Sequence, residues 1–313
     1  MKQLELPLQG AGGEPVDLRR TVSSHGLVSL PPMEPVEENS KLRITLPLTK
    51  GSPRTVVISE TSPGVAAIEV LGRAPSAATA EEILATVRRV LALDRNLSGF
   101  YERAARDPHL AWVTSGAGRM IQSPTVFEDV VKTICTTNCS WGATTRMVSA
   151  LVEHLGACAP GAPGTGWQGR AFPTPQAMSD AEEAFYKEVV RAGYRGPYFI
   201  SLARSVVAGD VDLEAWGSAT PDELSDDELA VRLQSLPGVG PYAAAHIMMM
   251  LGRHSRLILD SWTRPTYARL AGRRSVTDAT IERRFRPYKQ HAGLAFWLFL
   301  TRSWVPEPVQ NRP

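Results

Sequence analysis

Residues 225–270 read SDDELAVRLQSLPGVGPYAAAHIMMMLGRHSRLILDSWTRPTYARL, and this stretch decides the fold. Ser225 and Glu228 form a capping box, which predicts a helix that begins at Ser225. Leucines then recur at helical spacing on one face: Leu229, Leu233 and Leu236. The LPGVG run at 236–240 ends this helix, because its two glycines allow backbone angles that residues with a Cβ avoid.

A second helix is predicted to begin directly after the glycine turn. Pro241 suits a first helical turn, where no amide hydrogen is needed, and Gly252 is a typical C-terminal stop. The free amides at such a helix start form a ready site for an anion. A Gly-x-Gly pair alone is equally typical of a plain structural turn between helices.

Composition indicates an ordinary globular protein. With 313 residues, 43% hydrophobic and 21% charged, the chain can bury a sizeable core in two or three subdomains. No apolar run has membrane-spanning length, and the first ten residues lack the apolar core of a secretion signal. We therefore expect no membrane partner and a cytoplasmic setting.

Cysteines and histidines do not predict a cofactor. Cys135 and Cys139 are expected to be reduced thiols, and with Cys158 the odd number offers no even disulfide framework. There is no Cys-rich cluster near the C-terminus, which argues against an iron–sulfur centre. The six histidines are scattered without an H-x-x-x-H pair, which argues against a zinc site.

Basic residues concentrate in the C-terminal part of the chain. Between Arg253 and Lys289 there are ten Lys/Arg against three acidic residues, although the net charge is only +2. This local excess fits a phosphate-backbone partner, and it also fits a solvated surface of arginine-rich helices.

Four regions are predicted along the chain. Residues 1–15 are expected to be a flexible start, and 305–313 a tail. Residues 16–75 are expected to form a β-rich N-terminal domain, with antiparallel strands at Lys41–Leu48, Arg54–Glu60 and Val65–Leu71. Residues 76–304 read as helical, starting from a capping box at Thr79 and Glu82 and including the hairpin unit at 225–252.

Two polar features have both a structural and a functional interpretation. The cluster at 136–140 ends a helix that starts near Ser123, and it could cap that helix or form a loop that inserts into DNA. Asp260 follows an apolar run and precedes Ser-Trp-Thr, so it could simply cap the next helix.

The LPGVG run, followed 20 residues after Gly240 by Asp260, resembles the helix-hairpin-helix DNA glycosylase superfamily. That superfamily includes endonuclease III, the 8-oxoguanine glycosylases and the AlkA-type 3-methyladenine glycosylases. Segments 123–155, 172–175, 193–195 and 292–293 are similar to the last two groups, so the resemblance covers 79–304. It implies a mostly α fold of two helical subdomains, preceded by a small antiparallel β-containing N-terminal domain.

The resemblance also implies roles for individual residues. Asp260 would be the catalytic aspartate, because a carboxylate stabilises the cation-like sugar of the transition state and can position a water. The hairpin, Gly238 to Tyr242 with amides at Val239, Gly240 and Tyr242, would hold a DNA phosphate. The backbone carbonyls of Leu236 and Val239 would be candidate ligands of a monovalent cation.

DNA contacts away from the hairpin follow from the same resemblance. Asn138 matches the wedge residue that fills the gap left by a flipped-out base. Four aromatic residues are base-pocket candidates, although core packing is the simpler explanation for them: Trp141, Tyr194, Phe296 and Trp297.

Two departures from the family pattern narrow the expected activity. Bifunctional relatives have a lysine where this chain has Tyr242. Tyrosine cannot form an imine, so we expect a monofunctional enzyme. A lysine elsewhere could take over this role, and Lys132 is the only one near the wedge helix. The 8-oxoguanine enzymes have a glutamine where this chain has Ala295-Phe296, which favours an apolar stacking pocket.

The resemblance thus implies a monomeric DNA glycosylase acting on double-stranded DNA, with an alkylated purine as the best guess for the modified base. A glycosylase for another modified base, a non-catalytic helix-hairpin-helix DNA-binding protein and a structural protein remain as alternatives.

Overall fold

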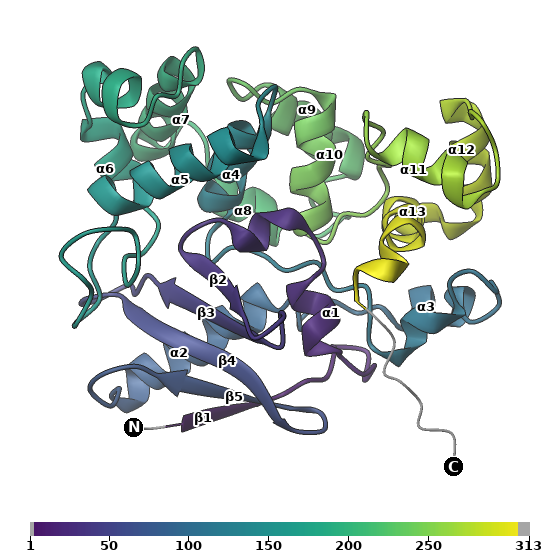
Figure 1. Cartoon of the computed structure of the whole chain (residues 1–313), viewed down its shortest axis with the longest axis horizontal. Helices are drawn as coiled ribbons and strands as arrows, with labels where there is room; N and C mark the ends of the chain where they lie inside the picture. The colour runs from purple at the N-terminus through teal and green to yellow at the C-terminus, as the bar shows by residue number, and fades with distance from the viewer. Residues whose placement is uncertain (1–2, 306–313) are drawn as a thin grey trace.

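An antiparallel sheet forms the N-terminal layer of the computed structural model, which describes residues 3–305. Its strand order is β1-β5-β4-β3-β2, and the sheet lies at the lower left of Figure 1. The strands are β1 (Gln3–Pro7), β2 (Met33–Val36), β3 (Lys41–Leu46), β4 (Arg54–Ser62) and β5 (Val65–Val70). Three of them occupy the predicted positions.

The expectation of a flexible start over 1–15 is wrong for its described part. Residues 3–7 form β1, which pairs along β5 with Leu4 opposite Ile68 and Leu6 opposite Ala66. Leu4 and Leu6 are buried while their neighbours are exposed, as expected for an edge strand with one covered face. The partner strand is some sixty residues away, so no local pattern indicates the pairing.

Helix α2 (Ala77–Val90) covers the sheet and shares its hydrophobic core. The helix begins at Ser76, whose Oγ accepts a hydrogen bond from Thr79 N–H, and not at the predicted capping box. Glu82 does not cap the helix, because its carboxylate accepts bonds from the N–H and hydroxyl of Thr49 at 2.5 and 2.7 Å.

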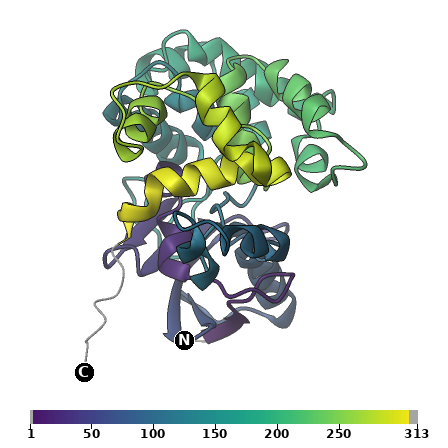
Figure 2. The same cartoon turned by 90° about the vertical axis from the view of Figure 1, so that its right-hand side faces the viewer.

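Helix α1 (Leu18–Val22) also packs into the core of the sheet, and the helices that follow α2 form two subdomains with separate cores (Figures 1 and 2). The first contains α4 (Val126–Thr136), α5 (Trp141–Leu155), α6 (Pro175–Asp180), α7 (Arg195–Ala208), α8 (Leu213–Ser218) and α9 (Asp226–Gln234). The second contains α3 (Ser98–Ala104), α11 (Thr263–Leu270), α12 (Asp278–Phe285) and α13 (Ala292–Thr301). No helix among residues 3–305 is long and apolar enough to cross a membrane.

Helix α10 (Pro241–Met250) lies between the two helical cores. Ala243, Ala244 and Ile247 pack into the first core, and Ala245 and Met249 pack into the second. This explains why the helix is apolar nearly all round: both flanks are covered, so only a narrow face remains outside the cores. Helix α10 therefore joins the two helical subdomains.

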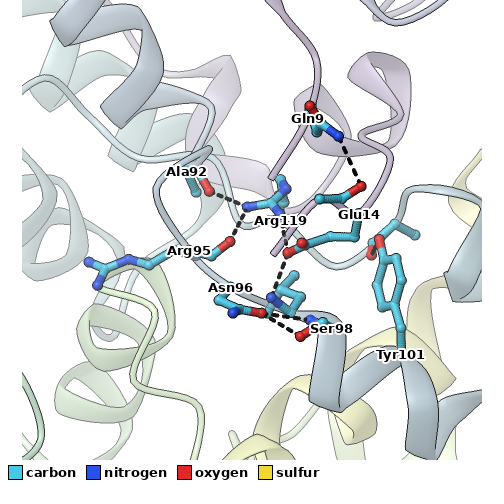
Figure 3. Close-up of polar contacts among 11 residues, drawn as sticks. Gln9, Glu14, Ala92, Arg95, Asn96, Ser98, Tyr101 and Arg119 are labelled. Atoms are coloured by element: carbon cyan, nitrogen blue, oxygen red, sulfur yellow. Dashed lines mark hydrogen bonds and ion pairs between the residues drawn. The ribbon is translucent and has the colours of Figure 1, made fainter. Parts of the chain in front are cut away.

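A buried ion pair fastens the N-terminal segment to the helical region (Figure 3). Arg119 Nη2 lies 2.6 Å from Glu14 Oε1, and Arg119 Nη1 also donates to the carbonyls of Ala92 and Arg95. The same glutamate oxygen accepts from Leu97 N–H at 2.5 Å. Because these charges are buried, the additional hydrogen bonds are what compensate their loss of hydration.

The fold is mostly helical with a small antiparallel sheet at the N-terminus, as the sequence predicts. Of the tail expected over 305–313, only Val305 falls within the described residues, and it is buried.

Candidate active site

The hairpin between α9 and α10 is built as the local sequence predicts. Ser225 Oγ caps α9 by accepting from Glu228 N–H at 3.2 Å, and Val239 N–H donates to Leu236 O at 3.1 Å to close the turn. Helix α10 starts after Gly240 with Pro241 in its first turn, and no side chain caps it. Its first amides are therefore without a side-chain partner, which suits an anion.

The two hairpin glycines serve different purposes. Gly238 has φ +80, a left-handed conformation, and an added Cβ would lie 2.7 Å from the Tyr198 ring and 3.3 Å from Ile134. Gly240 has an ordinary φ of −88, and an added Cβ would meet nothing within 4 Å. Gly238 thus allows the turn to pack against α4 and α7. Gly240 has no side chain on the outer surface of the hairpin, so another molecule can approach its backbone closely.

Asp260 caps the helix that follows it. Its Oδ1 accepts hydrogen bonds from the N–H groups of Trp262 and Thr263 at 2.8 and 2.6 Å, and its own N–H donates to Thr263 Oγ1 at 2.9 Å. All of these bonds to the carboxylate use one oxygen, so Oδ2 remains available to a ligand. The half-buried carboxylate is held at a fixed orientation by backbone groups.

A cavity of about 610 Å³ joins Asp260 to the hairpin and to the loop after α4. Gly238, Gly240 and Tyr242 line it from the hairpin, and Asn138 lines it from the loop. Its volume lies within the range typical of small-ligand sites. The structure therefore gathers the candidate catalytic aspartate, the hairpin and the candidate wedge residue around one cavity.

Hydrogen bonds hold the loop that carries Asn138 at the end of α4. Asn138 has a left-handed φ of +46, which asparagine tolerates better than most residues. Cys139 Sγ donates to Cys135 O at 2.9 Å, so the thiol serves the turn. From α7, the buried Arg195 donates to the carbonyls of Ile134 and Thr137, the residues that end α4.

The four aromatic base-pocket candidates occupy different environments. Tyr194 lines the cavity, is 51% exposed and lies over the Arg195 guanidinium at 4.4 Å. Trp141 is exposed but packs beside Gly26, outside the cavity lining. Phe296 has no exposed surface and packs against Tyr267 and Phe285, so the expectation for Phe296 is corrected: it is a core residue.

Trp297 is a buried core residue that does not line the cavity. It belongs to an aromatic cluster, defined as Tyr242, His246, Trp262, Trp297 and Trp304, of which Tyr242 lines the cavity. The Tyr242 ring meets His246 edge-on with centroids 4.6 Å apart, and His246 meets Trp297 at 5.9 Å. Trp262 and Trp304 each lie within 6 Å of Trp297.

Sequence reasoning missed His246 and Trp262. Their positions in the sequence could have indicated them, because His246 is one helical turn after Tyr242 and Trp262 follows Asp260 by two residues.

Burial shifts the proton equilibria around this cluster. It raises the pKa of Tyr242 to about 12, with the Asp260 carboxylate adding to the effect. It lowers the pKa of His246 to about 4, an effect that His25 reinforces and Asp260 opposes. At neutral pH both side chains are therefore uncharged, and Asp260 lies near enough to each to influence it.

Lys132 does not reach the cavity. Its side chain has no exposed surface, its ammonium lies 2.6 Å from Glu128 Oε1, and it donates to Leu30 O at 3.3 Å. A lysine held in a buried ion pair is not free to act as a nucleophile, and no lysine lines the cavity.

No metal site of the common kind is present in the described part of the chain. No group of three or more His, Cys, Asp or Glu side chains between residues 3 and 305 could hold a metal ion. Of the two candidate carbonyl ligands on the hairpin, Leu236 O already accepts the bond that closes the turn. A carbonyl has two lone pairs, so a monovalent cation at the hairpin stays a prediction.

Structural comparison places this fold among DNA glycosylases. The 3-methyladenine DNA glycosylase from Archaeoglobus fulgidus superposes with a TM-score of 0.72 at 20% sequence identity, over 97% of this chain and 100% of that chain. A structure titled MBOgg1 in complex with a low-affinity DNA ligand gives a TM-score of 0.71 at 17% identity, over 96% of both chains.

An 8-oxoguanine glycosylase/lyase from Clostridium acetobutylicum, in complex with double-stranded DNA containing cytosine opposite 8-oxoguanine, gives a TM-score of 0.65 at 21% identity. It covers 89% of this chain and 92% of that chain. Neither family models nor curated protein sequences give a match. The chain thus has the fold of the 3-methyladenine and 8-oxoguanine DNA glycosylases, as the resemblance of its hairpin predicts.

Proposed function

We propose that this protein is a monofunctional DNA glycosylase that hydrolyses the N-glycosidic bond of a modified base, with an alkylated purine as the preferred substrate. The observation that carries the proposal is the single cavity shared by Asp260, the hairpin and Asn138. A carboxylate, an anion site and a polar loop are the three parts that base excision from a duplex needs.

DNA binding in this proposal rests on the hairpin and the Asn138 loop. The uncapped amides at the start of α10 bind a backbone phosphate, a contact that carries no sequence information. Asn138, fixed at the end of α4, enters the space left when a nucleotide is extruded. The partner is therefore double-stranded DNA, gripped on either side of the cavity.

Asp260 performs the chemistry. As the bond between C1′ and the base nitrogen breaks, the electron pair leaves with the base and positive charge develops on the sugar. The Asp260 carboxylate stabilises that charge, and Oδ2 can orient a water that adds to C1′ and passes on its proton. The hydrogen bonds from Trp262 and Thr263 pre-orient the carboxylate, so little reorganisation is needed.

The monofunctional outcome follows from the side chains near Asp260. Strand cleavage through an imine requires an amine that attacks C1′, and Tyr242 has only a phenol whose pKa is raised to about 12. Lys132 is sealed into its ion pair with Glu128. Water is then the nucleophile that remains, and the product is an intact strand with an abasic site.

The substrate proposal rests on the aromatic cluster. Indole faces attract cations, and N-alkylation makes a purine both cationic and a better leaving group. Trp262 donates its backbone N–H to Asp260 and packs against Trp297, and His246 is uncharged at neutral pH, so nothing in the cluster repels a cationic base. Phe296 stands where the 8-oxoguanine enzymes have a glutamine, and this buried residue supplies no polar group for edge recognition at that position.

The test is base release from duplexes that each carry one modified base, followed by alkali to cleave abasic sites. Wild-type protein should release alkylated purines, and the strand should break only after alkali. Asp260→Asn should not release the base, whereas Asp222→Asn, a matched change at an exposed site, should act as wild type. If Asp260→Asn binds DNA and releases the base as well as wild type, a non-catalytic role for Asp260 is the better account.

A further inference from the structure

Helix α10 leaves one narrow face outside the hydrophobic cores. Seven of its ten residues are buried, and the others are Pro241, Tyr242 and His246. Tyr242 and His246 are four residues apart and therefore share a face, one turn above the other. Tyr242 lines the cavity, and the His246 ring lies directly behind it, with the two ring centroids 4.6 Å apart.

His246 Nε2 is a buried polar atom without a hydrogen-bond partner among the described residues. Within the aromatic cluster, the indole N–H of Trp297 does not serve it, because that N–H donates to Ser24 O at 2.7 Å. A buried nitrogen that lacks a partner costs free energy in the folded state, and a bound molecule that supplies the missing hydrogen bond would remove this cost.

We propose that His246 is a specificity-determining residue that reads the extruded base through a hydrogen bond from its imidazole to the polar edge of a purine. This inference rests on the proposed function and adds to it the group that distinguishes one purine from another. The base would enter past Tyr242, which meets His246 edge-on in the free protein. Its faces would then lie against the tryptophans of the aromatic cluster.

The charge of the imidazole suits this role. Burial, reinforced by His25 and opposed by Asp260, keeps the pKa of His246 near 4, so the ring is neutral when DNA is bound at physiological pH. A neutral imidazole has one donor and one acceptor nitrogen. It can therefore bond to an exocyclic amine or to an oxo group, and it does not repel a base that carries a positive charge.

Two variants separate the hydrogen bond from the packing. His246→Phe keeps a flat ring against Tyr242 and Trp297 without polar atoms, and His246→Gln keeps a donor and an acceptor. We expect His246→Phe to slow single-turnover release of alkylated purines by about 10- to 100-fold, the range of a lost buried hydrogen bond. His246→Gln should stay within about fivefold of wild type, and binding to unmodified duplex should not change. His154→Phe, at a histidine packed against Phe185, is the matched control.

A second measurement keeps this inference separate from the proposed function. Free purine bases, 3-methyladenine and hypoxanthine, should quench the fluorescence of the nearby tryptophans, and His246→Phe should weaken this binding by about tenfold or more. If wild type releases bases but His246→Phe releases and binds them equally well, the inference fails and the proposed function stands. If wild type releases no base, the proposed function fails, and the fluorescence titration alone decides whether His246 binds purines.

Discussion

The backbone N–H of Thr263 donates to Asp260 Oδ1 at 2.6 Å, and the N–H of Asp260 donates in return to Thr263 Oγ1 at 2.9 Å. This reciprocal pair has the geometry of a capping box, formed in the turn that leads into α11. It shows that capping does not compete with the proposed catalytic role of Asp260. The bonds that cap the helix also hold the carboxylate in one orientation and leave its second oxygen free.

Asp260→Asn and Asp260→Ala should therefore separate stability from activity. Asparagine caps helices about as well as aspartate, so Asp260→Asn should leave the free energy of unfolding nearly unchanged while base release falls by about 100-fold or more. Asp260→Ala should lose activity and also about 1 kcal/mol of stability. Urea unfolding beside single-turnover base release measures both. Equal stability of Asp260→Ala and wild type would contradict the capping role.

The hairpin glycines should respond differently to alanine. Gly238→Ala forces a Cβ into a left-handed conformation and towards the Tyr198 ring, so it should destabilise the protein by about 1–2 kcal/mol and also weaken DNA binding. The Cβ added by Gly240→Ala meets no protein atom, so this variant should keep its stability. Only its binding to DNA, measured on unmodified duplex, should weaken. Thermal unfolding and fluorescence anisotropy measure these effects. DNA binding by Gly240→Ala that equals wild type would remove Gly240 from the DNA contact.

Tyr242→Lys should convert the reaction mechanism. A lysine at this position would present an amine to the cavity beside Asp260, where it can attack C1′ and form an imine. Borohydride should then trap a covalent protein–DNA complex with Tyr242→Lys and none with wild type. Lys132→Met should not alter the wild-type result, because Lys132 has no access to the cavity. A trapped wild-type complex that disappears in Lys132→Met would overturn the monofunctional assignment.

Arg195→Met should impair base release more than DNA binding. Its guanidinium joins α7 to the carbonyls that end α4, so its loss should release the loop that presents Asn138. The carbonyls left without a donor should cost about 1–3 kcal/mol of stability. Base release should slow while affinity for unmodified duplex, held by the hairpin, stays within a few fold. Arg195→Lys should recover part of the rate, and equal rates for all three proteins would exclude this positioning role.

Acid should destabilise the protein through its buried histidines. Burial holds the pKa of His25 at about 4 against 6.5 in the unfolded chain, with its bond to Ile121 O opposing the shift. A lowered folded-state pKa means that the stabilisation is complete above pH 6.5 and is lost as the pH falls towards 4. Between these pH values His25 binds one proton more in the unfolded chain than in the folded chain. His25→Gln should therefore reduce the slope of the unfolding free energy against pH by about 1.4 kcal/mol per pH unit. Urea unfolding between pH 7 and 4.5 measures the slopes, and parallel curves would contradict the assignment.

Much of the hairpin unit follows from local sequence. Ser225, the glycine turn, Pro241 and Asp260 act on backbone groups within a few residues of themselves, so their pattern determines where helices start and stop whatever surrounds them. Their order along the chain was enough to predict the fold. It was also enough to name the hairpin, Asn138 and Asp260 as candidates, and the structure brings them to one cavity.

Other features depend on partners far away in sequence, and only the tertiary structure decided them. The strand β1 needs β5, and Arg119 needs Glu14, 105 residues away. Phe296 and Trp297 are buried neighbours in an apolar helix with no local pattern to tell them apart, yet packing places Phe296 against Tyr267 and Phe285 and Trp297 against His246. Local hydrogen bonds depend on residues that are close together in the sequence. The elements packed around a helix, in contrast, decide which of its sides meets a cavity.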